Sequence, residues 1–294
     1  MSTPIPSSPD ATPGFPGVEF GVSADGFPVA LVGEIAFAMM PTRDGRHYLA
    51  SAFKIGRPLY DLIRADFNGH SGGLSNEDEF RDKVRENAEH QRDKSALGRR
   101  EVPAASSSPW GTSQHAVRYG EGVIFHSTAA HGGFRLAPAQ NQEVLPLLRD
   151  NGGWYEEDEA WAIVALTFPA LVTAFERRCA ERTMKDSWPD AWEAMSGEVL
   201  KQGESKTKDR VAFQRDHADS WIVISAIGST HQKGFVECIA TRGGRRERQA
   251  QEQRFLVPSH EYEMGQFGFV IDPKRHASYD GPSDFVGWRG GRSS

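Results

Sequence analysis

Histidine and carboxylate side chains gather in the middle of the chain, where they suit metal binding or general base catalysis. His126 and His131 are followed by the acidic run Glu156-Glu157-Asp158-Glu159. Two imidazoles and one carboxylate make an adequate set of ligands for zinc or another divalent metal, with a position left for water. The candidate metal ligands are His126, His131 and Glu157.

A metal-assisted hydrolase centred on these residues is one of two interpretations. The sequence has no His-Glu-x-x-His motif or other characteristic spacing of metal ligands. In the alternative interpretation, His131-Gly132-Gly133 is a turn and the acidic run begins a charged helix. That alternative requires no metal or other cofactor.

A binding site at the same place needs no catalysis. If Val123 to Thr128 is a strand, His131 emerges after it, beside two glycines that let a ligand approach the backbone closely. The candidate binding residues in this region are His131, Gly132, Gly133, Trp154, Glu156 and Glu157.

Another set of catalytic residue types lies at Asp216-His217-Ala218-Asp219. A carboxylate there would orient the imidazole, and Ser225 or Ser229 lies nearby in sequence as a nucleophile. No Gly-x-Ser-x-Gly motif marks a nucleophile, so we do not favour a Ser-His-Asp hydrolase.

Arginines concentrate at Arg242, Arg245, Arg246 and Arg248. Guanidinium groups donate hydrogen bonds in a fork that matches phosphate oxygens, so these residues are candidates for phosphate binding. A solvated loop is the simpler interpretation of such a charged run. We therefore expect little direct nucleic-acid binding from them.

Composition and charge exclude several classes of protein. The 294 residues carry a net charge of −6 with both signs interspersed, which argues against a nucleic-acid coat and against a strongly acidic DNA mimic. The two cysteines form no Cys-x-x-Cys pair. Met1 to Gly17 has the composition of a disordered tail rather than a signal peptide, and Ala160 to Leu171 is too short to span a bilayer. We expect a cytoplasmic protein.

The periodicity of the chain predicts an α+β fold with about two domains' worth of residues. Short strands are predicted at Val18 to Val22, Val29 to Val32, Glu34 to Met40 and His47 to Phe53, with hairpin signals at Asp25-Gly26 and Asp44-Gly45. Helices are predicted over Pro58 to Phe67 and over Glu77 to Arg92, the second with a capping box from Ser75 to Asp78.

The middle of the chain is predicted to combine strands with a helical block. The strands are Ala116 to Tyr119, Val123 to Thr128 and a short one ending at Leu136; the helices are Glu143 to Leu148, Trp154 to Phe168, Leu171 to Met184 and Pro189 to Met195. Gly203 to Arg210 reads as a connector to a mostly antiparallel sheet made of Trp221 to Ile227, Phe235 to Thr241, Arg254 to Val257 and Gly268 to Ile271.

These elements suggest boundaries along the chain. We expect a disordered tail over residues 1–17, an N-terminal α+β region over 18–100, a Ser-rich linker over 101–108, a central α+β domain over 109–202 and a C-terminal β-rich region over 203–294.

Several stretches of the central domain carry a family signature. They are Pro109-Trp110-Gly111, Ser127 to Phe134, Gly153 to Asp158 and Trp188-Pro189-Asp190-Ala191. This central third of the chain resembles an uncharacterised domain family found in proteins of bacterial plasmids, integrative elements and phages of rhizobia-like hosts. The family has no known activity to transfer, so the resemblance implies a mobile-element context and assigns no role to any residue.

Two functions follow as expectations. The first is an accessory protein of a mobile genetic element that binds or inhibits a host or rival-element protein or nucleoprotein, including an anti-defence role, without catalysis. The second is the metal-assisted hydrolase of His126, His131 and the acidic run. Neither needs a membrane, and sites rather than folds distinguish them.

Overall fold

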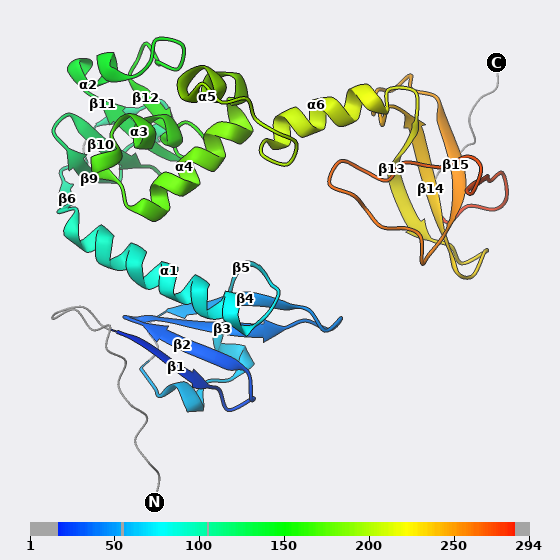
Figure 1. Cartoon of the computed structure of the whole chain (residues 1–294), viewed down its shortest axis with the longest axis horizontal. Helices are drawn as coiled ribbons and strands as arrows, with labels where there is room; N and C mark the ends of the chain where they lie inside the picture. Colours follow the sequence, from blue (N-terminus) through cyan, green and yellow to red (C-terminus); the bar gives the residue numbers. More distant parts are fainter. Residues whose placement is uncertain (1–16, 54–55, 105, 286–294) are drawn as a thin grey trace, which may run out of the picture. The chain divides into compact units, whose positions relative to one another are not determined.

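The computed structural model describes residues 17–53, 56–104 and 106–285 (Figure 1). It combines antiparallel sheets with helices, which confirms the predicted α+β class. The chain divides into two compact units, Met1–Met184 and Lys185–Ser294, with the division inside helix α4 (Ala174–Ser187). Apart from Gly17, the expected disordered tail lies outside the described residues.

The N-terminal sheet has five antiparallel strands in sequence order. They are β1 (Val18–Val22), β2 (Pro28–Val32), β3 (Ile35–Pro41), β4 (His47–Phe53) and β5 (Gly69–Leu74). The first four confirm the predicted strands to within a residue or so. Gly26 and Gly45 have φ values of +83° and +81°, which glycine adopts without strain, so both Asp-Gly signals mark real turns.

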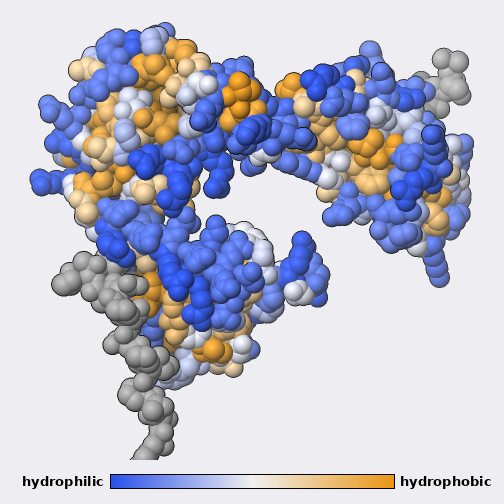
Figure 2. Space-filling view, viewed as in Figure 1, coloured by the Kyte–Doolittle hydropathy of each residue, from blue (hydrophilic) through white to orange (hydrophobic). Residues whose placement is uncertain are grey.

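Both faces of the N-terminal sheet are covered, so strand β3 is buried almost throughout. Helix α1 (Glu77–Ala96) lies along one face, as Figure 1 shows, and packs Phe80, Val84 and Ala88 there. The remaining surface of α1 is predominantly hydrophilic (Figure 2). Its N-cap is Asn76, whose side chain accepts a hydrogen bond from the Glu79 amide, one residue later than the predicted capping box.

The opposite face of the N-terminal sheet is covered by two 3-10 turns, η1 (Leu59–Asp61) and η2 (Arg64–Asp66). The helix predicted over Pro58 to Phe67 is therefore wrong. Leu62 and Ile63 are extended between the two turns, and the Asp66 carboxylate accepts a hydrogen bond from the Ile63 amide. Burying Leu59, Leu62 and Phe67 against the sheet outweighs the helical spacing of the same residues.

The central sheet is also antiparallel, in the order β12-β11-β10-β9-β6. Its strands are β6 (Arg100–Val102), β9 (His115–Gly120), β10 (Val123–Ser127), β11 (Gly132–Leu136) and β12 (Trp154–Glu156). Part of the expected linker is therefore an edge strand, because β6 pairs with β9. A small hairpin of β7 (Ser107–Ser108) and β8 (Gly111–Thr112) follows.

Short helices accompany the central sheet. They are α2 (Pro138–Glu143), α3 (Trp161–Thr167), the 3-10 turn η3 (Pro169–Leu171) and α4. The helix predicted from Trp154 is a strand at its start, because Trp154 to Glu156 pair with β11. The helix predicted over Glu143 to Leu148 forms earlier, with Pro138 at its first position, where a missing amide hydrogen costs nothing.

The C-terminal unit contains α5 (Pro189–Ser196), α6 (Lys206–Asp216) and a sheet of β13 (Trp221–Gly228), β14 (Phe235–Arg242), β15 (Glu252–Pro258) and β16 (Ala277–Ser278). The predicted connector is helix α6, capped by Ser205. The strand predicted at Gly268 to Ile271 is absent from the described residues, where Val270 makes an isolated bridge to Ile222. None of the described helices is long and apolar enough to cross a membrane.

Candidate functional site

A cavity of about 390 Å³ lies against one face of the central sheet, which we call the cavity face. Its wall residues come from strands β9, β10 and β11, from the segment after β12 and from the helices beyond it: Tyr119, Phe125, Phe134, Glu157, Trp161, Val172 and Glu176. Helix α3 contacts β11 and β12, and Figure 1 shows it over the sheet. The cavity thus lies between the sheet and the helices and is open to solvent on one side.

Strand register explains the aromatic wall. Phe125 and Phe134 are directly opposed in β10 and β11, which places both rings on the cavity face. Their centroids are 5.1 Å apart in an edge-to-face arrangement, and Tyr119 lies edge-on to Phe134 at 4.9 Å. Aromatic rings present electron-rich faces, so a wall of this kind favours apolar groups and cations.

Glu157 supplies a carboxylate to this wall because Gly132 leaves room for it. A Cβ on Gly132 would lie 2.3 Å from Glu157 Oε2 and 3.0 Å from Phe125 Cζ. The Glu157 amide donates a hydrogen bond of 3.0 Å to the Gly132 carbonyl, which holds the two residues side by side. The side chain of Glu157 is 37% exposed, so its charge faces both the cavity and water.

His131 stands next to the same carboxylate. Its Nδ1 atom is 3.9 Å from Glu157 Oε1 and 3.9 Å from Asp158 Oδ2. The structure therefore brings together His131, Gly132 and Glu157, three of the residues that the sequence singles out, at one edge of the cavity.

The second carboxylate of the wall, Glu176, already has a cation. Arg99 donates hydrogen bonds of 2.9 and 2.5 Å to it, and the guanidinium carbon lies 3.8 Å from the centre of the Tyr119 ring. Burial raises the pKa of Glu176, but hydrogen bonds from Arg99 and from the Thr173 amide outweigh burial and hold that pKa below its ordinary value. Glu176 is therefore an anion neutralised from within the protein.

His126 lies on the other face of the sheet and does not join His131. His126 pairs with Gly133, and Gly133 pairs with Glu156, so these three residues share one face of the sheet. Their sequence neighbours Gly132 and Glu157 lie on the opposite face, which is the cavity face. The His126 imidazole is buried, with Nδ1 3.1 Å from Ser113 Oγ. Burial, with a smaller contribution from Arg135, lowers the pKa of His126 and favours a neutral ring.

Two tryptophans complete the surroundings of His126. Trp154 lies 5.4 Å from the imidazole, and Trp110 packs edge-on against Trp154 at 5.7 Å. A Cβ on Gly133 would lie 2.4 Å from the Trp110 ring, so Gly133 is required for this packing. Trp154, Gly133 and His126 thus form a packed cluster. The Glu156 carboxylate accepts hydrogen bonds from the amides of Asp158 and Glu159 and shapes their loop.

The metal site expected from His126, His131 and Glu157 is not assembled. Within residues 17–53, 56–104 and 106–285, no three His, Cys, Asp or Glu side chains are placed to hold a metal ion. The reason is the two-residue period of strands, which sends His126 to one face and the Glu157 carboxylate to the other.

The arginine cluster of the C-terminal unit is partly engaged with its own backbone. The Arg242 guanidinium bonds to the Asp219 carbonyl and stacks 4.2 Å over Trp221, and Arg246 donates a 2.9 Å hydrogen bond to the Ile224 carbonyl. Arg245 and Arg248 are exposed. The predicted phosphate site therefore retains two freely exposed guanidiniums.

His217 has a local role. Its Nδ1 atom lies 3.4 Å from Ser220 Oγ, and its ring packs against Phe213 at 4.6 Å. Ser229 Oγ accepts a hydrogen bond from the Gln232 amide. In the described part of the chain these contacts do not connect His217 to Ser225 or Ser229 as a hydrolase would need.

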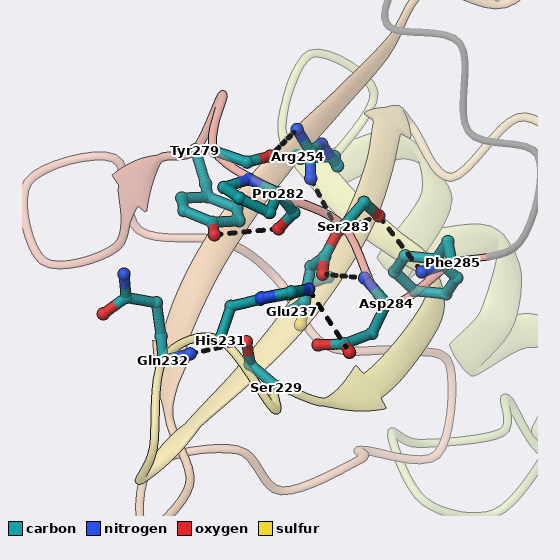
Figure 3. Close-up of polar contacts among 12 residues, drawn as sticks. Ser229, His231, Gln232, Glu237, Arg254, Tyr279, Pro282, Ser283, Asp284 and Phe285 are labelled. Carbon is teal, nitrogen blue, oxygen red and sulfur yellow. Dashed lines mark hydrogen bonds and ion pairs between the residues drawn. The ribbon is translucent and has the colours of Figure 1, made fainter.

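A buried ionic network in the C-terminal unit has no counterpart in the sequence predictions (Figure 3). Glu237 on β14 is fully buried and pairs with Arg254 on β15 at 2.8 Å. It also accepts hydrogen bonds from Ser283 Oγ at 2.6 Å and from the Asp284 amide at 3.0 Å. The network therefore ties the segment after β16 onto the sheet. Because its members are far apart in sequence, the sequence alone shows which residue types are present but does not predict which of them pair.

The aromatic wall was also not predicted as a site. Phe125 and Phe134 belong to predicted strands, and their alternation with polar residues is typical of a buried sheet face, which does not distinguish a core from a cavity. Trp161 and Glu176 come from helices, and nothing local to the sequence places them opposite the sheet.

All seven wall residues fall within one recognisable segment of the chain. Residues 103–218 match the model of a domain of unknown function, DUF7007. The DUF7007 match spans the four stretches that carry the family resemblance and extends beyond the expected boundaries of 109 and 202. An uncharacterised domain is therefore confirmed, whereas its mobile-element context stays a prediction. No curated protein and no solved structure matches the chain.

Proposed function

We propose that this protein is a cytoplasmic accessory protein of a mobile genetic element that binds a host or rival-element protein or nucleoprotein without catalysis, as an anti-defence factor would. The DUF7007 domain is its binding module. Its cavity accepts a positively charged side chain, lysine or arginine, from the protein partner. The mobile-element context comes from the family resemblance; the binding role rests on the geometry of the cavity.

One observation supports this binding role above the others: the aromatic wall carries a carboxylate that lacks a strong cation. Among the described residues, the nearest basic group to Glu157 is His131 at 3.9 Å, whereas Glu176 is bonded to Arg99. A cation beside Glu157 would contact aromatic faces and a carboxylate at once. Such contacts contribute about 0.5–2 kcal/mol from the rings, with a further 0.2–1 kcal/mol from a partly exposed ion pair.

The size of the cavity agrees with a side chain as its occupant. At about 390 Å³ it lies at the small end of ligand sites, which span roughly 300–1,000 Å³. An extended amine with an apolar stem would place methylene groups against Phe125, Phe134 and Trp161 and its charge at Glu157.

The test uses n-butylammonium as a probe for the lysine side chain and 1-butanol as its neutral counterpart. NMR shifts of the tryptophan indole resonances report binding, with Trp161→Phe assigning the resonance of Trp161. We expect n-butylammonium to bind with a dissociation constant on the order of 1 mM, since five heavy atoms contribute about 0.8 kcal/mol each. The alcohol should bind at least threefold more weakly.

Glu157→Gln and Asp158→Asn are a matched pair of variants. Both remove one negative charge near His131, but only Glu157 lines the cavity. Glu157→Gln should lower the affinity for n-butylammonium about threefold to tenfold, while Asp158→Asn should leave it within a factor of two. Equal losses in both variants, or no binding by the native chain, would refute the cavity as the binding site.

A further inference from the structure

The face of the central sheet opposite the cavity carries a row of arginines. Strand register sets the row: Arg100 opposes Arg118, Arg118 opposes Ile124, and Ile124 opposes Arg135. Directly opposed residues in antiparallel strands project from the same face, so one line of side chains crosses β6, β9, β10 and β11. We call this side of the sheet the arginine face.

Two of these arginines are free to bind a ligand. Arg100 and Arg118 are exposed, and neither has a hydrogen-bond or ion-pair partner among the described residues. Both line a shallow depression of about 620 Å³, together with Ile124 and the turn Gly120-Glu121-Gly122. Arg135 is half-buried, bonded to the Gly152 carbonyl and 5.2 Å over the Trp154 ring.

The pairing of Arg100 with Arg118 is unfavourable for folding by itself. Like charges placed directly opposite each other in a sheet are destabilising, and no described carboxylate forms an ion pair with either arginine. Glu121 lines the same depression, His126 in the next row is buried, and Glu156 is bonded to its own loop. With Arg135, the row carries three positive charges, against the carboxylates of Glu121 in the depression and Glu156 on the same face.

We propose that the arginine face binds the phosphate backbone of a single-stranded nucleic acid. Arginine forks match phosphate oxygens with two parallel hydrogen bonds, and an anionic ligand would relieve the repulsion between Arg100 and Arg118. A single row of cations follows one phosphate chain, whereas a duplex presents two. With neighbouring strands ~4.8 Å apart, the three arginines span about 14 Å, the length of roughly four nucleotides at 3.4 Å each.

This inference does not depend on the cavity, because Arg100 and Arg118 lie on the opposite face of the sheet from Glu157; Tyr119 borders both sites. It extends the proposed function to the nucleic-acid half of a nucleoprotein. Glu157→Gln should leave oligonucleotide affinity unchanged, and the arginine variants should leave n-butylammonium binding unchanged. Failure of either proposal is therefore visible without the other.

The experiment measures fluorescence anisotropy of a labelled 12-nucleotide single-stranded DNA with the full-length protein at several salt concentrations. The test variant is R100Q/R118Q. The matched control is R245Q/R248Q, which removes two arginines of the C-terminal unit that are also exposed. We expect log affinity to fall with log salt at a slope near −1.4, because the two free arginines contribute ~0.7 each. The test variant should lose at least tenfold in affinity and more than 1 unit of slope.

The control variant should bind within a factor of two of the native chain. Thermal denaturation separates binding from folding: R100Q/R118Q should be as stable as the native chain or more so, since the substitution removes repulsion. The proposal fails if the native chain shows no salt-sensitive binding or if both variants lose affinity equally. Equal affinity for a duplex of the same sequence would overturn the single-strand assignment, and equal affinity for a polyglutamate peptide would assign the face to an acidic protein.

Discussion

Gly132 is the residue on which the cavity geometry depends most directly. Because Gly132 has no Cβ, the Glu157 carboxylate and the Phe125 ring can both lie close to its backbone. Its carbonyl accepts a hydrogen bond from the Glu157 amide. The neighbouring Gly133 serves the opposite face, where Trp110 covers it. Two adjacent glycines therefore allow close packing on both sides of one strand, which explains the Gly-Gly pair after His131.

Gly132→Ala is expected to displace Glu157 and to destabilise the protein by about 1–3 kcal/mol, the usual cost of overpacking. Affinity for n-butylammonium should fall with it. The control is Gly228→Ala, also in a strand, where an added Cβ meets nothing within 4 Å. Urea denaturation and the NMR titration measure the two effects; an alanine at 132 that changes neither would show that Glu157 does not need this space.

Glu237 is the other single residue that we expect to affect the stability of the protein, through the ionisation of its carboxylate. Burial raises its pKa, but hydrogen bonds from Ser283, Arg254 and the Asp284 amide outweigh burial and hold the pKa below its ordinary value of 4.5. Unfolding therefore takes up a proton as the pH falls below about 4.5. The stability that the carboxylate contributes is complete above that pH and is lost as the pH falls toward the folded-state pKa.

Glu237→Gln should destabilise the C-terminal unit by about 3–5 kcal/mol at pH 7, because the buried Arg254 loses its carboxylate. Below pH 4.5 the native protein loses this advantage, so the difference between the two proteins should narrow. Urea denaturation between pH 3 and pH 7 tests this. A difference that stays constant over the whole range would mean that Glu237 is not ionised in the folded state.

At the scale of elements, one edge strand of the central sheet, β6, lies in a segment whose composition predicts a linker. Residues Glu101 to Ser108 are rich in small and polar types, yet β6 pairs with β9 and contributes Arg100 to the arginine face. The Arg99 side chain next to it is 7% exposed and anchored to Glu176. Pairing with β9 on one side and the ion pair with Glu176 of helix α4 on the other therefore hold the backbone of this segment in place.

Trypsin should consequently cut the native protein after Arg245 or Arg248 before it cuts after Arg99 or Arg100. The first pair lies in an exposed turn between β14 and β15, whereas cleavage at the second requires β6 to detach. We expect cleavage after Arg99 or Arg100 to be about tenfold slower, equivalent to ~1.4 kcal/mol of local opening. Mass spectrometry of early fragments measures the order; early cleavage at Arg100 would indicate an unpaired β6.

At the scale of the whole molecule, the chain has separate hydrophobic cores. Both faces of the N-terminal sheet bury their own clusters, and the C-terminal sheet buries a further cluster around Trp221, Cys238 and Phe255. The division into compact units falls within helix α4 rather than at the Ser-rich segment. Each unit therefore has the means to unfold on its own.

Differential scanning calorimetry of the full chain should show more than one transition, because independent cores break two-state behaviour. Glu237→Gln should lower the melting temperature of one transition by at least 5 °C and leave the rest unchanged. A single transition that moves as a whole would show that the units unfold cooperatively.

The sequence by itself determined the elements whose signals are local. The first four strands, helix α1 and strands β9, β10, β13 and β14 follow from alternation, helical spacing and Asp-Gly turns. The strand ends match the predictions closely, whereas α1 runs on to Ala96, beyond the predicted end at Arg92. Apolar periodicity is a property of neighbouring residues, so no distant contact was needed to recognise it. The uncharacterised domain was recognisable for the same reason, from short runs of residues.

Tertiary structure decided the conformation of segments whose local sequence pattern is ambiguous, and it decided which distant residues come together. Residues 58–67 became two turns because burial against the sheet overrode helical spacing, and Trp154 became a strand residue because β11 offered a pairing edge. His126 and His131 look like partners in sequence, but β10 turns His126 to the face opposite Gly132 and Glu157, whereas His131 lies beside Glu157. The cavity, the arginine row and the Glu237 network all join residues distant in sequence, and only strand register and packing bring those residues together.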